Sequence, residues 1–230
     1  MKKDIYKIDN SIEKLLNNKH TLFLDQKELL DIKSKINKNK YNIYYPNKSS
    51  EKVILYKDNI PKISLYKINS YNPLKHQQIL GSILSLNISP SYLGDIIKYK
   101  DEYYFYILSD LDNLIQEEFK YVGSNKITLD LIDIDYLKDY EREYETIEFI
   151  VSSPRIDNVI ARLINTNRDK VIDLIKDKDV ILNYQILTKN SYNLKENDIF
   201  SIRRYGKYKY MGIKNITKKD KIVVSVLKYL

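Results

Sequence analysis

The side chains of this chain that are best suited to chemistry are the arginines, lysines and capping amides between Arg155 and Arg203. The stretch begins R-I-D-N-V-I, continues N-R-D-K-V-I-D-L-I-K and D-V-I-L-N, and ends L-K-E-N-D-I-F-S-I-R-R. Two short helices with basic and polar starts, followed by a basic strand, would gather donors for an anion. The planar fork of arginine suits bidentate contact with phosphate. The pattern therefore predicts binding of a polyanion.

The positive charge of the chain is concentrated near its carboxyl end. From residue 203 to residue 230, nine basic side chains stand against Asp220, which gives +8, the formal net charge of the whole chain. The nine are Arg203, Arg204, Lys207, Lys209, Lys214, Lys218, Lys219, Lys221 and Lys228. Residues 1–202 therefore sum to zero, which a uniform bias toward lysine would not produce. A localised positive field attracts polyanions, and nucleic-acid backbones are the commonest of these.

Composition excludes several classes of site. The chain has no cysteine, which removes disulfides, thiolate catalysis and cysteine-ligated zinc. Its two histidines, His20 and His76, are far apart, so we expect neither a metal site nor another cofactor. Apolar runs are only a few residues long, and the N-terminus M-K-K-D-I-Y-K-I-D-N lacks a signal-peptide core. We expect a cytoplasmic protein without membrane segments.

Periodicity predicts an α+β protein with an N-terminal subdomain, a central domain and a terminal domain. Residues 1–60 read as an α/β subdomain in which Asp25 and Glu28 form a capping box before the second helix. Residues 61–131 alternate as βαββαβ, the RRM-like plait, with Asn72-Pro73 and Ser109 expected at the helix starts. Residues 132–147 are acidic and read as a solvated linker; the alternative is an RNA mimic that shields the basic residues.

Residues 148–230 are predicted as a binding domain with basic terminal strands. The strand T-I-E-F-I-V leads to a helix expected from Ser153 and Pro154, and Asn167 is expected to cap a second helix. Further on, Lys207 and Lys209 alternate with Tyr208 and Tyr210. In a strand this places ammonium groups on one face and phenol rings on the other.

The predicted RNA-binding residues lie in this last domain. They are Arg155, Arg168, Lys170, Lys176, Lys178, Asn183, Arg203, Arg204, Lys207 and Lys209. Neighbouring aspartates balance the cations of the second helix, so Lys170 and Lys176 also fit as solvated helix charges. Strands that begin with Arg203 and Arg204 have few acids nearby, and we expect the cationic face there.

The central domain offers weaker candidates. Tyr104 and Tyr106 could stack on bases, as aromatic residues do on the sheet of an RRM. The basic-glycine start of that signature is missing, since Asp101 and Glu102 stand there, and core packing is the alternative for both rings. His76 opens a helix and could contact RNA or have a structural role. No nucleophile–base pair, metal-ligand spacing or phosphate-cradling glycine loop is present, so we expect no enzyme activity.

The stretch from Val151 to Arg203 resembles the S-four domain, the αL RNA-binding motif. That family runs R-L-D, then S-R-x-x-A with L-I, then V-x-V-N-G and G-D. The matching positions here are Arg155, Asp157, Arg168, Leu174, Ile175, Val180, Asn183 and Asp198. Asn167 replaces serine, Val171 replaces alanine, and Lys178 and Asn197 stand where glycine is usual. Because a helix-ending αL residue is usually glycine, the turn at Lys178 is expected to differ.

The whole chain is similar to the YlmH family of bacterial S-four proteins. Its landmarks are F-L-D-Q-K-E at Phe23, H-Q-Q-I-L-G-S at His76, G-D-I at Gly94, Y-V-G at Tyr121 and R-R-Y-G-K-Y-K at Arg203. Gln77 and Gln78 replace a usual Arg-Asp pair, and Pro90 stands at a place commonly basic, which weakens the case for RNA contact by the central domain.

This resemblance implies a monomeric, ribosome-associated factor that binds structured rRNA and tRNA. It would act on stalled large subunits that carry peptidyl-tRNA. The alternatives are ribosome assembly, free tRNA binding, or a protein scaffold linked to cell division.

Overall fold

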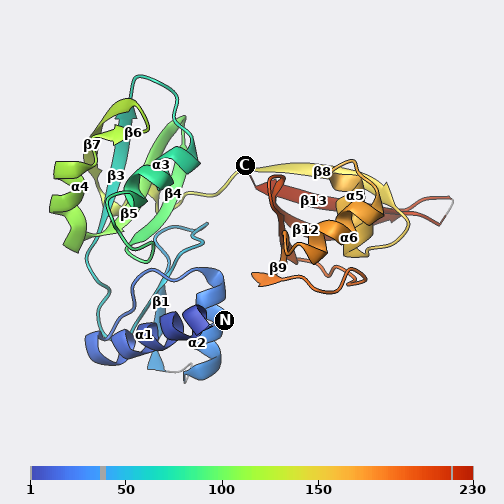
Figure 1. Cartoon of the computed structure of the whole chain (residues 1–230), viewed down its shortest axis with the longest axis horizontal. Coiled ribbons are helices and arrows are strands. Elements are labelled where there is room, and N and C mark those ends of the chain that lie inside the picture. The colour runs from blue at the N-terminus through green and yellow to red at the C-terminus, as the bar shows by residue number, and fades with distance from the viewer. Residues whose placement is uncertain (1, 37–39, 219, 230) are drawn as a thin grey trace. The chain divides into compact units, whose positions relative to one another are not determined.

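The structure is a computed structural model that describes residues 2–36, 40–218 and 220–229. The described residues form α-helices and β-strands in a two-stranded, a five-stranded and a six-stranded sheet, which confirms a mixed α and β fold. The chain divides into two compact units, residues 1–141 and 142–230 (Figure 1). Each unit has its own core.

The first unit opens with helix α1 (Lys2–Asn18) and helix α2 (Gln26–Lys35). The predicted capping box at α2 is confirmed: the Asp25 carboxylate accepts from the Glu28 N–H at 2.8 Å, and the Glu28 carboxylate accepts from the Asp25 N–H at 2.9 Å. Strands β1 (Asn42–Tyr44) and β2 (Ile54–Tyr56) pair antiparallel beside these helices. A small core joins them, formed by Leu15, Leu24, Leu29, Ile32, Val53 and Leu55.

The five-stranded sheet follows. Its elements are β3 (Ile63–Ser70), α3 (His76–Leu84), β4 (Leu93–Tyr99), β5 (Glu102–Leu108), the 3₁₀ turn η2 (Ser109–Leu111), α4 (Asp112–Glu118), β6 (Tyr121–Val122) and β7 (Asn125–Ile132). The strands lie in the order β4-β5-β3-β7-β6, all antiparallel. The predicted order βαββαβ is therefore present, with β6 added as a short hairpin partner of β7.

Both predicted helix starts in this sheet's crossovers were wrong. Helix α3 begins at His76 behind Lys75, so Pro73 lies in the preceding loop and not in the first turn. Helix α4 begins at Asp112 after η2, and the Ser109 hydroxyl instead lies 2.8 Å from the Ser64 hydroxyl. Cap-like residues are also common in loops, because their side chains bond to nearby backbone there.

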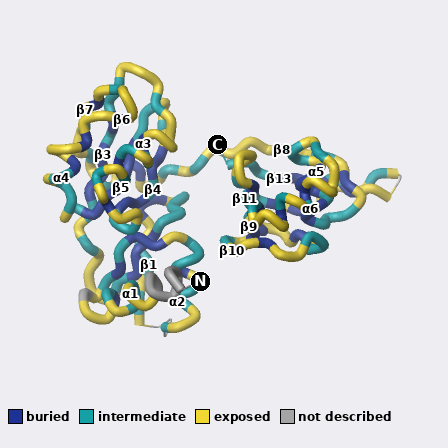
Figure 2. The backbone as a smooth tube through the Cα atoms, viewed as in Figure 1, coloured by how far each residue is buried: buried dark blue, intermediate teal, exposed yellow. Residues whose placement is uncertain are grey.

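Both faces of this sheet are covered. On one face, α3 and α4 pack against a core that contains Tyr66, Phe105 and Ile107. On the other face, Phe23 and Ile54 of the N-terminal segment pack on the opposite side of β5. The backbone of Phe23 also donates to the Ser91 carbonyl at 2.9 Å. Figure 2 shows dark blue, buried stretches in the central strands β3 and β5. Residues 1–60 thus form one lid of the sheet, within the same compact unit.

Residues 132–147, predicted as a solvated linker, are mostly exposed, and the division between the two compact units falls within them, after residue 141. Ile132 ends β7, and the 3₁₀ turn η3 (Ile134–Leu137) follows, with Leu137 buried against the covered sheet face. Strand β8 (Tyr144–Val151) then begins before the predicted boundary at residue 148. The apolar residues spaced between the acids explain this, because one face of such a segment can pack while the acids stay in water.

The second unit is one six-stranded sheet covered by two helices. Helices α5 (Ile156–Leu163) and α6 (Arg168–Lys176) follow β8, and the other strands are β9 (Val180–Leu182), β10 (Gln185–Ile186), β11 (Ile199–Ile202), β12 (Gly206–Ile216) and β13 (Ile222–Tyr229). The order is β10-β9-β11-β12-β13-β8. The buried core includes Val159, Ile160, Val171, Phe200 and Tyr208.

The helix starts of this unit agree in part with the predictions. The Asn167 side chain accepts from the Lys170 N–H at 2.8 Å, so the predicted cap of α6 is confirmed. Helix α5 begins later than predicted, at Ile156 behind Arg155 and not at Ser153. The side chain of Asn158 donates to both serine hydroxyls, of Ser152 at 2.6 Å and of Ser153 at 3.0 Å.

None of the helices among the described residues is long and apolar enough to cross a membrane.

Candidate nucleic-acid interface

A buried carboxylate joins the starts of α5 and α6. Asp157 is fully buried. It accepts two hydrogen bonds from Arg155, at 3.1 Å from Nε and 2.7 Å from a terminal nitrogen. A terminal nitrogen of Arg168 donates to the same carboxylate at 2.8 Å. The two arginines that the sequence predicted are therefore brought together, across 11 residues of sequence between Asp157 and Arg168.

Electrostatics keep this cluster ionised. Burial raises the pKa of Asp157, but the hydrogen bonds and charges of Arg155 and Arg168 outweigh burial, so the pKa lies below its usual value. The side chains of Arg155 and Arg168 remain 35% and 50% exposed. Each guanidinium has five N–H donors, so both retain donors that face water. Asp157 therefore orients two guanidinium groups that can also contact phosphate.

Helix α6 contributes less. Lys170 is exposed, and Lys176 lies 3.8 Å from Asp173. Lys178 ends the helix with φ 62°, the conformation that usually favours glycine, and its N–H bonds to the Ile175 carbonyl at 3.1 Å. The predicted difference in this turn was therefore wrong: the αL turn is kept, and lysine occupies it. RNA contact by these three lysines stays a prediction.

Asn183 has a structural role in a turn. Its side chain donates to the Asp198 carboxylate at 2.8 Å and accepts from the Ile199 N–H at 2.9 Å. It is exposed, with φ 46°. These bonds tie the β9–β10 turn to the start of β11, and an RNA contact by Asn183 stays a prediction.

The remaining predicted residues surround the β11–β12 turn. Arg203 and Arg204 are both exposed there, and Arg203 pairs with Asp179 at 3.2 Å. The alternation along β12 is confirmed: Tyr208 and Tyr210 are buried in the core, while Lys207 and Lys209 lie on the opposite face. The turn and the start of β12 therefore present four basic side chains.

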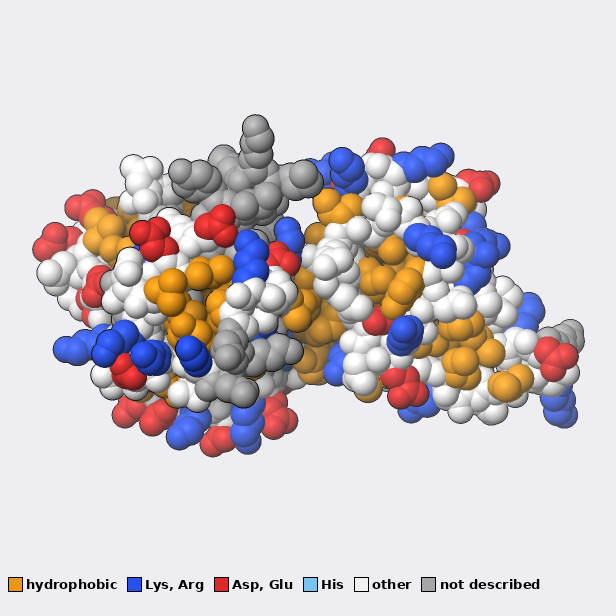
Figure 3. All heavy atoms as spheres, turned by 90° about the horizontal axis from the view of Figure 1, so that it is seen from below, with side chains coloured by type: hydrophobic (Ala, Val, Ile, Leu, Met, Phe, Trp, Pro, Cys, Tyr) orange, Lys and Arg blue, Asp and Glu red, His pale blue; other side chains and the backbone are white. Residues whose placement is uncertain are grey.

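The described basic residues after position 202 do not form one patch, which corrects the prediction of a single localised field. Strand β12 has 11 residues, so its ends lie roughly 33 Å apart. Lys207 lies at one end, whereas Lys218 and Lys221 lie beyond the other, where they line a shallow cleft with Arg162. Figure 3 shows basic side chains at several separate places on the second unit. Lys219 lies outside the described residues.

Two lysines of the hairpin are paired with the acidic strand β8. Lys228 lies 3.2 Å from Glu145, and Lys214 lies 3.5 Å from Glu148. Exposed pairs of this kind contribute little to stability. Lys228 lies across from Tyr208, so its pair lowers the positive field beside the β11–β12 turn, and the Lys214 pair lowers the field toward the other end of the hairpin.

The structure contradicts base stacking by Tyr104 and Tyr106. Their exposed fractions are 2% and 0%. Tyr136 of η3 covers the ring of Tyr104, with centroids 5.6 Å apart, and the Tyr104 hydroxyl donates to Glu102 at 2.8 Å. The N-terminal lid occupies the face that an RRM uses for RNA. Core packing, the alternative for both rings, is confirmed.

Burial of Tyr106 predicts a loss of stability in alkali. Burial raises the pKa of this phenol to about 12, whereas an unfolded tyrosine ionises near pH 10. Above pH 10 the unfolded state loses its proton first, so the free energy of unfolding falls as pH rises, by about 1.4 kcal/mol per pH unit for this group. Urea unfolding at pH 9 and pH 11 should show this fall, and Tyr106→Phe should reduce it by about that amount. Identical slopes in both proteins would contradict the assignment.

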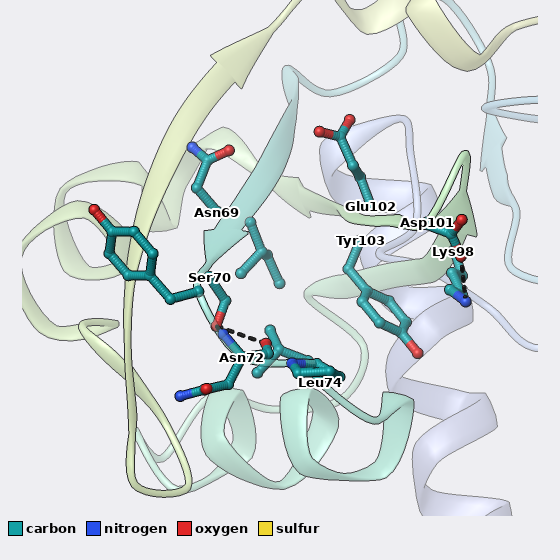
Figure 4. Close-up of a pocket in the computed structure, with 11 residues that line it drawn as sticks. Asn69, Ser70, Asn72, Leu74, Lys98, Asp101, Glu102 and Tyr103 are labelled. Carbon is teal, nitrogen blue, oxygen red and sulfur yellow. Dashed lines mark hydrogen bonds and ion pairs between the residues drawn. The ribbon is translucent and has the colours of Figure 1, made fainter.

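The first unit also has a cleft of about 420 Å³ between the β3–α3 loop and the β4–β5 hairpin (Figure 4). Its charged residues are paired: Lys98 lies 2.8 Å from Asp101, and Glu102 lies 2.6 Å from Lys67. The lining has one basic and two acidic side chains, which does not suit phosphate. His76 is exposed at the start of α3 and does not line the cleft, so its contact with RNA stays a prediction.

Comparison with known proteins finds similar proteins. Residues 59–136 match the family model described as "Putative RNA-binding domain in YlmH". The "Ribosome-associated protein quality control protein P2" of Bacillus subtilis (strain 168) is 25% identical over 186 residues, which cover 77% of this chain and 72% of that protein. Over these residues the chain is similar to YlmH proteins. The match begins where the five-stranded sheet begins, so the RNA-binding description falls on the unit whose sheet is covered on both faces.

Two further matches cover a smaller share of this chain. The solved "Cell division protein ylmH from Streptococcus pneumoniae" is 21% identical, covers 60% of this chain and 94% of its own, and has a TM-score of 0.47. Thiamine pyrophosphokinase of Saccharomyces cerevisiae (strain ATCC 204508 / S288c) is 27% identical over 163 residues, which are 68% of this chain and 48% of that enzyme.

Sequence reasoning missed three aromatic and basic residues of the second unit: Arg142, Tyr184 and Tyr229. They contact Lys207 or one another through ring faces. Alternation along β13 places Tyr229 on the face opposite Val224 and Val226, and this pattern could have identified Tyr229 from the sequence. The abundance of tyrosine, 22 in the chain, obscured it.

Proposed function

We propose that this protein is a YlmH-type, ribosome-associated factor that binds structured RNA through its second unit. In this proposal residues 148–230 act as an S-four-type domain and residues 61–131 as an RRM-like scaffold. The observation that carries it is the placement of two half-exposed guanidinium groups on one buried carboxylate, at the starts of two short capped helices. Such a pair can hold consecutive phosphates of a folded backbone.

The RNA that we propose is rRNA and tRNA on large ribosomal subunits that retain peptidyl-tRNA after translation stalls. The name of the Bacillus subtilis relative, a ribosome-associated quality control protein, supports this assignment. The separation of basic residues along β12 supports it as well. An RNA that contacts both ends of the hairpin must span roughly 33 Å, a distance that a large folded RNA covers.

The proposal includes a non-catalytic, monomeric, cytoplasmic protein without a cofactor. The absence of cysteine supports the lack of thiolate chemistry. Several charged side chains form ion pairs with one another, such as Lys67 with Glu102, and these pairs have a structural role. In this view the protein acts by occupying and ordering RNA.

Co-sedimentation tests the proposal most directly. Purified protein is mixed with 30S subunits, 50S subunits, and 50S subunits loaded with peptidyl-tRNA, and the gradient fractions are probed. We expect migration with the large subunit, strongest with peptidyl-tRNA present, and loss of migration as salt rises. Equal binding to free tRNA and to assembly precursors would favour the alternative roles of the same surface. Absence of binding to rRNA, tRNA and subunits at low salt would overturn the proposal.

A matched pull-down from cell extract, with and without RNase, tests the scaffold alternative. Partners that depend on RNA support the proposal. Retention of a division-related protein after RNase, together with loss of ribosomal RNA, would overturn it in favour of a scaffold.

A further inference from the structure

Three tyrosines and two cations gather at one end of the β12–β13–β8 sheet. Tyr229 of β13 lies directly across from Tyr144 of β8, with ring centroids 5.0 Å apart in an edge-to-face arrangement. Lys207 Nζ of β12 lies 4.7 Å from the Tyr229 ring centroid and 5.3 Å from that of Tyr184. The guanidinium of Arg142 lies 5.6 Å from the Tyr229 ring centroid. We call these five residues the aromatic–cation cluster.

The tyrosines of this cluster keep part of their surface exposed. Tyr144 is 39% exposed, and Tyr184 and Tyr229 are partly exposed. By contrast Tyr208 and Tyr210, on the other face of β12, are buried in the core. Partly exposed aromatic rings beside ammonium and guanidinium groups match the composition of single-strand RNA sites, where bases stack and cations hold phosphates.

The backbone at Tyr184 gives an independent indication. Asn183 and Tyr184 occupy the β9–β10 turn with φ 46° and 66°. A two-residue hairpin turn of this hand favours asparagine followed by glycine, because both positions need positive φ. A tyrosine at the second position is strained. Its ring nevertheless lies beside the Lys207 ammonium. The turn itself does not need this side chain, so its presence indicates a role in binding.

We propose that the aromatic–cation cluster binds an unpaired nucleotide of the RNA partner. This inference rests on the proposed function and specifies its ligand. The base stacks against the tyrosine rings, and Lys207 contacts the phosphate beside it. The rings position the Lys207 ammonium in the free protein, and transfer of the ammonium to a phosphate exposes ring surface to the base. A paired base inside an A-form helix cannot present its face in this way.

The test variant is Tyr184→Gly, because glycine removes the ring and also relieves the turn. The fold is therefore expected to survive, with a melting temperature equal to or above that of the wild type. The matched control is Tyr184→Phe, which keeps the ring. Lys207→Ala serves as the phosphate control.

The probe is a ten-nucleotide single-stranded RNA with one 2-aminopurine, compared with the same strand in a duplex. We expect wild-type protein to quench the 2-aminopurine of the single strand, and Tyr184→Gly to bind it roughly 10-fold more weakly. The salt slope of Tyr184→Gly should stay unchanged, whereas Lys207→Ala should lose about 0.7 from the log–log slope. Tyr184→Phe should bind like the wild type.

The outcomes separate this inference from the proposed function. If structured RNA binds but Tyr184→Gly binds the single strand as well as the wild type, the cluster is not a stacking site and the proposed function stands. If an acidic peptide displaces the strand at equal concentration, the cluster is a general anion surface, which also overturns the inference. If wild-type protein binds neither folded RNA nor the single strand, the proposed function fails as well.

Discussion

Reversing the charge of Lys207 and Lys209 together is expected to weaken binding to structured RNA roughly 10- to 100-fold at about 0.1 M salt. Both side chains project from one face of β12 beside the turn that carries Arg203 and Arg204. Each lost phosphate contact should also remove about 0.7–0.9 from the slope of log affinity against log salt. The double variant Lys207→Glu with Lys209→Glu should therefore flatten that slope by roughly 1.4–1.8. Filter binding across a salt series measures both quantities.

The matched control is Lys189→Glu with Lys195→Glu, two exposed lysines of the same unit. This control changes the net charge by the same amount. We expect it to lose less than threefold in RNA affinity, because only the long-range attraction between protein and RNA becomes weaker. Lys170→Glu with Lys176→Glu then tests helix α6. If that variant loses more affinity than the β12 variant, the phosphate-binding face lies on the helices and our assignment to the strands is wrong.

Local patterns in the sequence predicted local structure well. The capping box of Asp25 and Glu28, the cap by Asn167 and the lysine–tyrosine alternation of β12 depend on neighbours within a few residues, and the structure contains all three. The order of helices and strands in the central sheet was predicted for the same reason. Each of its elements has its own apolar period.

Features that depend on distant residues were not predictable. Tyr104 and Tyr106 looked like candidates for stacking because nothing in β5 shows that Phe23 and Leu137 cover them. The basic residues after Arg203 are close in sequence, but a long hairpin carries them to opposite ends of the sheet. The pairing of β8 with β13 brings Tyr144 next to Tyr229 across most of the second unit's sequence. Such contacts follow from strand order, which periodicity does not specify.

The Arg155–Asp157–Arg168 cluster combines both kinds of information. The resemblance supplied the residues, and the structure supplies their arrangement around one buried carboxylate. This arrangement makes it possible to test whether Asp157 orients the two arginines or only neutralises their charge. If the arginines act only through the net field, removing the acid that neutralises them should strengthen RNA binding. If Asp157 orients them, its removal should weaken binding although the protein becomes more positive.

Asp157→Asn is expected to lower the free energy of unfolding of the second unit by about 2–3 kcal/mol, because a buried partner of two guanidinium groups is lost. The pKa of Asp157 is lower in the folded protein than in the unfolded chain. The stability that its carboxylate contributes is therefore fully present above the unfolded pKa and is lost as pH falls through the folded pKa. Wild type and variant should therefore converge in stability in strong acid. RNA affinity should fall roughly fivefold at neutral pH, since both forks lose their common anchor. The control Asp169→Asn adds the same charge at an exposed site of α6 and should bind equally or more tightly. Tighter binding by Asp157→Asn, measured under conditions where it is folded, would show that the carboxylate only neutralises the arginines and does not position them.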